Sequence, residues 1–141
     1  MYRLLLDTNY LLDFVDETRP DSSQAAELFI RIVHGEFIGV VSAPSLKDFY
    51  YLVRKHGSDQ EARDWIRTFM RLFEVEELDA EVCSIALESD EPDFEDGCIR
   101  AIAERAQVDF IITRDERAFE RSWIKTRSPR QFVALFPEVY D

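Results

Sequence analysis

The stretch RLLLDTNYLLDF, residues 3–14, places an aspartate where a buried strand is expected to end. Residues 3–7 contain a continuous apolar run, Leu4 to Leu6, that ends at Asp7, and such a run is typical of a strand covered on both faces of a parallel sheet. The apolar positions of residues 11–14 then favour a helix. A carboxylate at such a junction either caps the helix or faces a ligand crevice, and this stretch alone leaves both roles open.

Outside this stretch, the chain continues to alternate between strand-like and helix-like segments. Because the predicted strands are separated by helices, we expect parallel pairing with right-handed crossovers. The sequence therefore predicts an α/β fold, a three-layer α/β/α sandwich with a central parallel sheet, in a single domain over residues 1–141. Further strands are predicted at 37–42, 74–78, 109–113 and around 123–126, and further helices at 21–35, 44–57, 58–73, 79–89, 93–107, just after Asp115 and at 128–136.

The composition is that of a globular protein, with 46% hydrophobic and 33% charged residues. No apolar run is long enough to span a membrane, and Met1 leads directly into the first strand, so we expect no membrane association and a cytoplasmic location. Cys83 and Cys98 lack a second Cys or His at ligand spacing and are predicted to be core residues. His34 and His56 lie near predicted helix ends, where a surface position is expected.

The net charge of −12 argues against binding to nucleic acid, because phosphates repel carboxylates. The charge is unevenly distributed, however. Residues 72–99 contain eleven acidic residues and no Lys or Arg, whereas residues 114–130 contain six basic residues and three acidic ones. Two interpretations remain open: a basic flank beside an acidic pocket, or ordinary solvated faces.

Five aspartates are candidates for a shared site. Asp7 and Asp115 follow two predicted parallel strands, and the carboxyl ends of such strands meet at one edge of a sheet. Asp48 lies beside the apolar stripe of its helix, as either a boundary residue or one directed into a cleft. Asp93 is placed as a helix N-cap, and Asp96 falls in the first turn of the same helix.

Carboxylates gathered in one cleft repel one another unless a cation neutralises them. Oxygen ligands without a nearby His or Cys favour Mg²⁺ or Mn²⁺ over zinc. Such ions usually retain water and bind substrate phosphate, so the pattern points to phosphoryl chemistry.

Three segments resemble the motifs of the PIN-domain nucleases, in particular the small bacterial proteins that include VapC-type toxins of toxin–antitoxin pairs. The resemblance covers essentially the whole chain, and the motifs occur in the family's order. The segments are LLLDTNYLLDF (4–14), SAPSLKDFYYLVRKHG (42–57) and DFEDGCIRAIAERAQVDFIITRD (93–115).

The resemblance implies a metal-binding and catalytic set of Asp7, Asp48, Asp96 and Asp115, assisted by Asn9, Asp93 and Thr113. Separately from the resemblance, Arg114 adjoins Asp115, and Arg117 and Arg121 follow at helical spacing. Arg114 and Arg117 are therefore predicted either to bind RNA beside the pocket or to be surface partners of Glu116 and Glu120.

The implied activity is that of an endoribonuclease dependent on Mg²⁺ or Mn²⁺, which hydrolyses a phosphodiester bond of single-stranded or structured RNA. The implied partner is a cognate antitoxin that occupies the groove in place of RNA. We also expect a homodimer.

The chain departs from the family pattern at two places. In TRDERAF, Asp115 stands where the most similar subgroup often has Asn, and Ala118 stands where that subgroup has Asp. Gly97 and Cys98 replace a usual Ala-Leu pair. Ala118 keeps open a second interpretation, a PIN fold that serves as an interaction module with weak or no catalysis.

A third interpretation is a different acidic α/β enzyme, such as a phosphatase-type or receiver-type phosphotransfer domain. That class requires a paired-acid motif and a lysine after a late strand. In this chain Thr8 and Asn9 follow Asp7, and no lysine directly follows residues 109–113.

Overall fold

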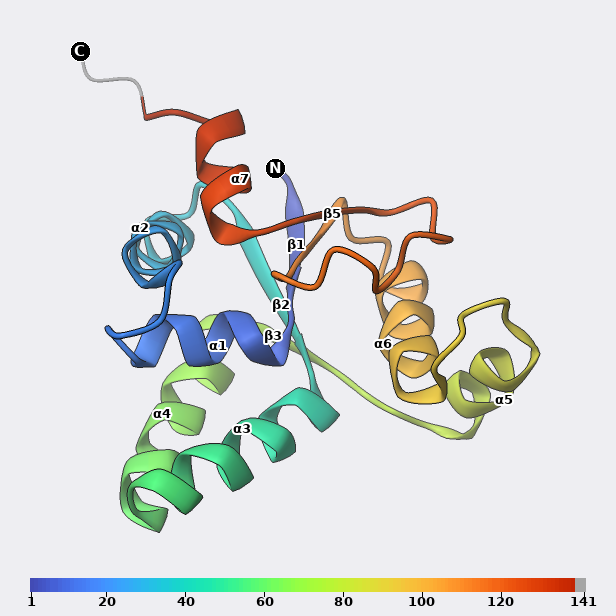
Figure 1. Ribbon diagram of the computed structural model, residues 1–141, viewed down its shortest axis with the longest axis horizontal. Helices are drawn as coiled ribbons and strands as arrows, with labels where there is room; N and C mark the ends of the chain where they lie inside the picture. The colour runs from blue at the N-terminus through green and yellow to red at the C-terminus, as the bar shows by residue number, and fades with distance from the viewer. Residues whose placement is uncertain (139–141) are drawn as a thin grey trace.

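The computed structural model describes residues 1–138 and contains a five-stranded parallel sheet with helices on both faces (Figure 1). The predicted three-layer α/β/α sandwich is confirmed. The strands are β1 (Arg3–Leu6), β2 (Ile38–Ser42), β3 (Glu74–Glu76), β4 (Phe110–Ile112) and β5 (Lys125–Arg127), in the order β3-β2-β1-β4-β5. The helices are α1 (Thr8–Val15), α2 (Ser22–Val33), α3 (Ala43–His56), α4 (Asp59–Leu72), α5 (Ala80–Glu88), α6 (Phe94–Arg105) and α7 (Pro129–Leu135).

Strand β1 lies in the middle of the sheet, and its side chains are buried on both faces. Leu4 and Leu6 pack into the core formed with α1, α2, α3, α4 and α7, whereas Leu5 packs into the core formed with α5 and α6. This two-sided burial is the reason that residues 3–7 read as a continuous apolar run and not as an alternating one.

The strand order reverses direction next to β1. From β1 the chain builds β2 and β3 on one side, and then returns to place β4 and β5 on the other side. In open parallel sheets, ligands bind outside the carboxyl ends of the strands at such a switch point. Leu6 of β1 pairs with Ile112 of β4, so the residues that follow both strands, Asp7 and Thr113, emerge side by side.

The short helix predicted just after Asp115 is absent from the structure, and this prediction was wrong. Turns and bends occupy the segment between β4 and β5. The carboxylate of Asp115 accepts hydrogen bonds from the backbone N–H groups of Arg117 and Ala118 at 3.0 and 3.1 Å, and Phe119 adopts a positive φ of 68°. Local side-chain bonding and the burial of Phe119 therefore replace a helical turn.

The histidines and cysteines, for which the sequence predicted no role in a site, lie as expected, with one exception. His34 and His56 are exposed, and Cys98 is buried, but Cys83 is only half-buried. Both cysteines are free thiols. Within residues 1–138, no helix has the length and apolar character needed to cross a membrane.

Candidate active site

Asp7 is held at the carboxyl end of β1 with its carboxylate free of a capping role. It occupies the N-cap position of α1 but makes no side-chain capping hydrogen bond there. Its backbone N–H donates to the carbonyl of Ile112 at 3.1 Å, which extends the pairing of β1 and β4 by one bond. The helix-cap interpretation that the sequence left open is therefore not the one observed.

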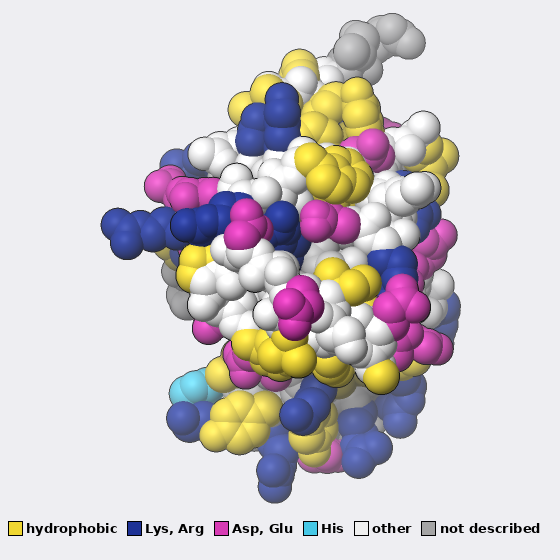
Figure 2. All heavy atoms as spheres, turned by 90° about the vertical axis from the view of Figure 1, so that its right-hand side faces the viewer, with side chains coloured by type: hydrophobic (Ala, Val, Ile, Leu, Met, Phe, Trp, Pro, Cys, Tyr) yellow, Lys and Arg dark blue, Asp and Glu magenta, His cyan; other side chains and the backbone are white. Residues whose placement is uncertain are grey.

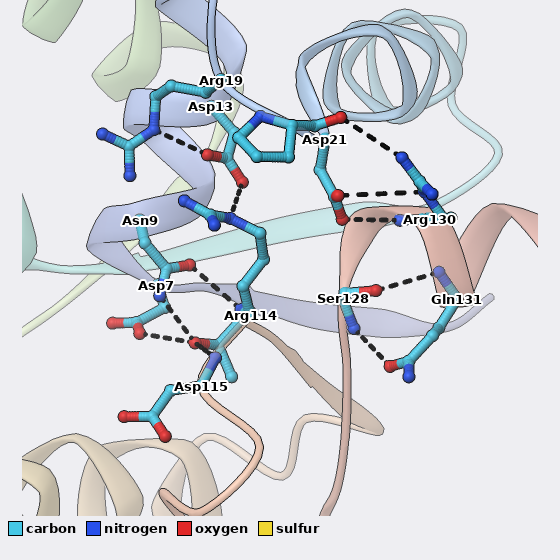
Figure 3. Close-up of polar contacts among 12 residues, drawn as sticks. Asp7, Asn9, Asp13, Arg19, Asp21, Arg114, Asp115, Ser128, Arg130 and Gln131 are labelled. Atoms are coloured by element: carbon cyan, nitrogen blue, oxygen red, sulfur yellow. Dashed lines mark hydrogen bonds and ion pairs between the residues drawn. The ribbon is translucent and has the colours of Figure 1, made fainter.

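The hydroxyl of Thr113 orients the Asp7 carboxylate. Thr113 is buried, and its Oγ1 accepts from the amide of Asn9 at 2.9 Å and from the backbone N–H of Asp115 at 3.2 Å. Because both of these groups are donors, the hydroxyl proton points to Asp7 Oδ2, 3.0 Å away (Figure 3). Thr113 thus links three of the predicted site residues.

Asn9 acts on Asp7 through Thr113. Its Nδ2 donates to Thr113, and its Oδ1 accepts from the backbone N–H of Arg114 at 3.3 Å. Both ends of the amide are used, so its orientation is determined by its partners. Asn9 is therefore linked to the Asp7 carboxylate through the Thr113 hydroxyl and not by a direct hydrogen bond.

Asp96 lies in the first turn of α6, as predicted. Asp93 is the N-cap of this helix and accepts from the backbone N–H of Asp96 at 2.9 Å. Gly97 allows α6 to pack closely on α5, since a Cβ there would lie 3.3 Å from the Cβ of Ala86. The Asp96 carboxylate itself makes no hydrogen bond or ion pair within the described part of the chain.

Burial and crowding of negative charge raise the pKa values of the two central aspartates. Burial is the largest cause for Asp7, and the charges of Asp115 and Asp48 add to it, against hydrogen bonds from Thr8 and Thr113. The pKa of Asp96 rises from 3.8 to about 6, first through burial and then through repulsion by Asp93, followed by Asp7 and Asp115. Raised carboxylate pKa values of this kind are common at functional sites.

The four predicted ligands lack cationic partners. No ion pair among residues 1–138 includes Asp7, Asp48, Asp96 or Asp115. The charges of Asp48 and Asp115 act on Asp7, and those of Asp7 and Asp115 act on Asp96. The described residues nevertheless contain no group of three or more His, Cys, Asp or Glu that is close enough together to hold a metal ion. The site is therefore a loose group of carboxylates.

Asp115 and Ala118 share one turn. Asp115 is exposed, and its Oδ1 accepts the N–H groups of Arg117 and Ala118. Ala118 is buried in the core with Phe119 and Ile124, where a carboxylate would lose its hydration. In this chain the carboxylate that follows β4 is therefore that of Asp115, with one oxygen used by the turn.

A buried ion-pair network involving Arg114 was not predicted from the sequence. Asp13 of α1 is fully buried, and its two oxygens each accept from one arginine at 2.8 Å, Oδ1 from Arg19 and Oδ2 from Arg114 (Figure 3). Arg114 is thus an ion-pair partner of Asp13, and its predicted role in RNA binding stays a prediction. Asn9 and Asp13 lie one helical turn apart on α1, so the sequence alone indicated that their side chains share one face of this helix.

Arg117 remains the basic residue available beside the carboxylates. It is exposed, and its side chain forms no ion pair within the described residues. The absence of the predicted helix means that Arg117 and Arg121 do not share a helical face.

Figure 2 shows acidic side chains across the middle of the face formed by α5 and α6, with many basic ones at the end near α3 and α4.

Glu91 is a second residue that sequence reasoning missed. Its side chain is only 3% exposed, and it accepts from the backbone N–H of Phe119 at 3.3 Å and from Arg100 Nη1 at 3.4 Å. It therefore ties the segment before α6 to the segment after β4. Its charge also contributes to the raised pKa of Asp96.

Removing the shared acid of the buried network should destabilise the protein. In Asp13→Ala, Arg19 and Arg114 lose their common partner, but both are about one-third exposed and retain access to water. We expect a loss of roughly 2–3 kcal/mol in the free energy of unfolding, below the ~3–5 kcal/mol of fully buried pairs. Urea denaturation measures it. Asp64→Ala, which breaks the exposed pair with Arg67, is the control and should change stability by less than about 1 kcal/mol.

Neutralising Asp96 should stabilise the fold near neutral pH. Because its folded pKa is raised to about 6, the folded state binds more protons than the unfolded state between about pH 4 and 6, so stability falls as the pH rises through this window. Asp96→Asn should therefore have a higher Tm than the wild type at pH 7.5, and the difference should shrink toward pH 4. Glu95→Gln, an exposed change in the same helical turn, should give no such gain, and an equal gain would contradict the crowding of charge at Asp96.

Comparison with known proteins identifies the family and the fold. A family model described as PIN domain matches residues 3–117. Among solved structures, the chain is similar to Mycobacterium tuberculosis VapC20, described as a sarcin–ricin loop cleaving toxin, with a TM-score of 0.67, 14% identity, and coverage of 84% of this chain and 95% of that one. It is also similar to a chain of a Klebsiella pneumoniae toxin–antitoxin complex (TM-score 0.67, 20% identity, coverage 89% and 97%).

A third similar structure is DNA-bound VapBC from Salmonella typhimurium, with a TM-score of 0.66, 18% identity, and coverage of 92% of this chain and 99% of that one. At these identities the structural likeness establishes the fold. No curated protein matches the sequence significantly. The family model spans most of the sequence, and the chain therefore belongs to the PIN-domain family.

Proposed function

We propose that this protein is an endoribonuclease that depends on Mg²⁺ or Mn²⁺ and acts as the toxin of a toxin–antitoxin pair. The observation that carries this proposal is the group of carboxylates at the switch point of the sheet. Asp7 and Asp96 have raised pKa values there, and within residues 1–138 neither forms an ion pair with an arginine or lysine. A site that concentrates negative charge without a protein counter-charge is suited to a cation.

The donor set fits a hard divalent cation. All the candidate ligands are carboxylate oxygens, and the two histidines are exposed at distant helix ends. Asp7 and Asp96 would hold the ion, with Asp115 through its second oxygen and Asp48 directly or through water. When bound, Mg²⁺ or Mn²⁺ supplies Lewis-acid chemistry, which makes water a better nucleophile near neutral pH and offsets the negative charge of the phosphate.

The protein contributes orientation and charge to hydrolysis. Thr113 keeps one oxygen of Asp7 engaged at 3.0 Å, so the other oxygen points in a defined direction. Asn9 and the N–H of Asp115 hold the Thr113 hydroxyl in turn. No side-chain nucleophile is required, because the attacking group in this proposal is water.

RNA needs a source of attraction besides the cation, since the carboxylates repel phosphate. Arg117 adjoins Asp115 in the turn after β4 and is free to contact the backbone of a bound strand. Arg114 is committed to Asp13 through its Nε, so only its outer guanidinium nitrogens are available to RNA.

The partner in this proposal is an antitoxin that occupies the carboxylate groove and excludes RNA. Support comes from the similar folds, which include a chain of the Klebsiella pneumoniae toxin–antitoxin complex and DNA-bound VapBC from Salmonella typhimurium. We further propose a homodimer that acts in the cytoplasm, where RNA is the substrate.

Purified protein should cleave single-stranded RNA when Mn²⁺ or Mg²⁺ is added, and Asp7→Asn should abolish cleavage. The substitution keeps the side-chain shape and removes the charge that attracts the cation, so the Tm should not fall. Gel assays of labelled RNA and a calorimetric Mn²⁺ titration provide the two readouts. Asp64→Asn, on the exposed face of α4, is the matched control. Cleavage that survives in Asp7→Asn or in excess EDTA would exclude the metal-dependent mechanism.

Arg117→Ala should weaken RNA binding uniformly across sequences and reduce the slope of log affinity against log salt by about 1. The measurement is fluorescence anisotropy with labelled RNA, made in the Asp7→Asn background so that the RNA stays intact. Mn²⁺ binding, measured in the wild-type background, should be unaffected. Arg67→Ala, which removes an exposed arginine from α4, should leave the slope unchanged. An unchanged slope in Arg117→Ala would show that this residue does not contact the RNA backbone.

If the wild type cleaves no RNA under any of these conditions, the interaction-module interpretation becomes the better one. The observation that keeps it available is the use of one Asp115 oxygen by the turn, together with the buried Ala118. A phosphotransfer domain is disfavoured by the match to the PIN-domain model.

A further inference from the structure

A cavity of about 720 Å³ opens directly beside the carboxylate group. One wall is the segment after β4, and it includes Thr113, Arg114 and Asp115. The opposite wall is the junction of β5 with α7, and it includes Ser128 and, in the first turn of α7, Gln131. Figure 3 shows these two walls facing each other. The volume lies in the range of roughly 300–1,000 Å³ that is usual for small-ligand pockets.

The lining has the chemistry that a nucleotide requires. Pro20, Ala134 and Leu135 provide an apolar surface, on which the flat face of a base can lie, and Leu135 is 52% exposed. Arg114, which also pairs with Asp13, and Arg127 provide positive charge in the lining. The lining also includes three acids, Asp21, Asp115 and Glu116, of which Asp21 accepts from the backbone N–H of Arg130 at 3.3 Å.

Gln131 presents a fixed hydrogen-bond donor to the cavity. Its Oε1 accepts from the backbone N–H of Ser128 at 2.9 Å, while Ser128 Oγ accepts from the backbone N–H of Gln131 at 3.1 Å. Because the Ser128 N–H can only donate, the atom facing it must be oxygen, which settles the orientation of the amide. The NH₂ group is left exposed, with no partner among residues 1–138.

We propose that this cavity binds the nucleotide of the RNA strand next to the cleaved phosphate, and that the Gln131 amide donates to a carbonyl oxygen of its base. This inference rests on the proposed ribonuclease function, because Thr113 and Asp115 belong both to the carboxylate site and to the lining of the cavity. Guanine, cytosine and uracil each carry a carbonyl oxygen, and adenine does not. Where the other bases present this oxygen, adenine presents an amino group or a C–H, neither of which accepts a hydrogen bond. A donor placed at that position therefore selects against adenine next to the cut.

Inosine and adenosine 5′-monophosphates test this, because at the 6 position of the purine inosine has a carbonyl oxygen and adenosine an amino group. In an NMR titration of the full chain, both should shift signals of residues 113–116 and 126–131, with inosine bound roughly two- to tenfold more tightly, the effect of one net hydrogen bond. Gln131→Glu retains the oxygen that accepts from Ser128 but replaces the donor with an acceptor. It should abolish or reverse the preference.

The ratio of the two affinities is independent of the added charge, because both nucleotides carry the same phosphate. Gln60→Glu, the same change on the exposed surface of α4, should keep the wild-type ratio. Ala134→Phe, which fills the apolar wall, should weaken both nucleotides alike. An unchanged ratio in Gln131→Glu, or shifts confined to other surfaces, would overturn the assignment.

Cleavage assays separate this inference from the proposed function. Short RNAs that differ only beside the cut should be cleaved more slowly when adenine stands there, and Gln131→Glu should remove that difference. If the nucleotides bind as expected and no RNA is cut, the subsite stands and the ribonuclease proposal fails. If RNA is cut and the base preference is the same in Gln131→Glu, the subsite fails and the ribonuclease proposal stands.

Discussion

Strand β1 is hydrogen-bonded on both sides, to β2 and to β4, and its pairing with β4 continues for one bond beyond the strand through the N–H of Asp7. This pairing determines the positions at which the segments that follow β1 and β4 leave the sheet. Asp7 and Thr113 emerge next to each other, so a hydroxyl on one segment can hold a carboxylate on the other. Thr113 is able to do so because Asn9 and the N–H of Asp115 occupy its acceptor positions. A change of register by one residue would turn these side chains to the other face and break the network.

Close to Asp7 and Thr113, the positive and negative side chains are kept apart. Arg114 is adjacent in sequence to two site residues, Thr113 and Asp115, and could have neutralised the carboxylates. Instead, Asp13 binds it from the buried face of α1, together with Arg19. The positive charge is directed away from Asp7 and Asp96, which keep raised pKa values. The buried ion pair thus leaves Asp7 and Asp96 without an arginine or lysine partner among residues 1–138.

The same short segments also build the cavity next to the carboxylates. The turn after β4 supplies Asp115 on one wall, and the reciprocal capping of Ser128 and Gln131 stiffens the other. Because the Oε1 atom of Gln131 is used in capping, the direction of its NH₂ group is determined as well. Elements whose first role is structural therefore provide oriented groups in the lining of this cavity.

The sequence by itself determined the fold class and most of its elements, because the signals are local. The apolar run of residues 3–7 and the helical periodicity of the segments between strands depend only on near neighbours, and so does the capping of α6 by Asp93. The positions of Asp7, Thr113 and Asp115 at the carboxyl ends of two parallel strands followed from the same pattern. The order of motifs added the family resemblance, which the PIN-domain model bears out.

Only the tertiary structure decided which groups meet. The side chain of Asp115 closes a turn in place of the predicted helix, since its contacts depend on a core that buries Ala118 and Phe119. The pairing of Asp13 with Arg114 joins residues about one hundred positions apart, and no local pattern records it. Burial of Asp96 beside other carboxylates, which sets its pKa, likewise requires α6 to be placed against the sheet. Sequence spacing determines local conformation, whereas desolvation and charge pairing depend on distances that only the packed chain defines.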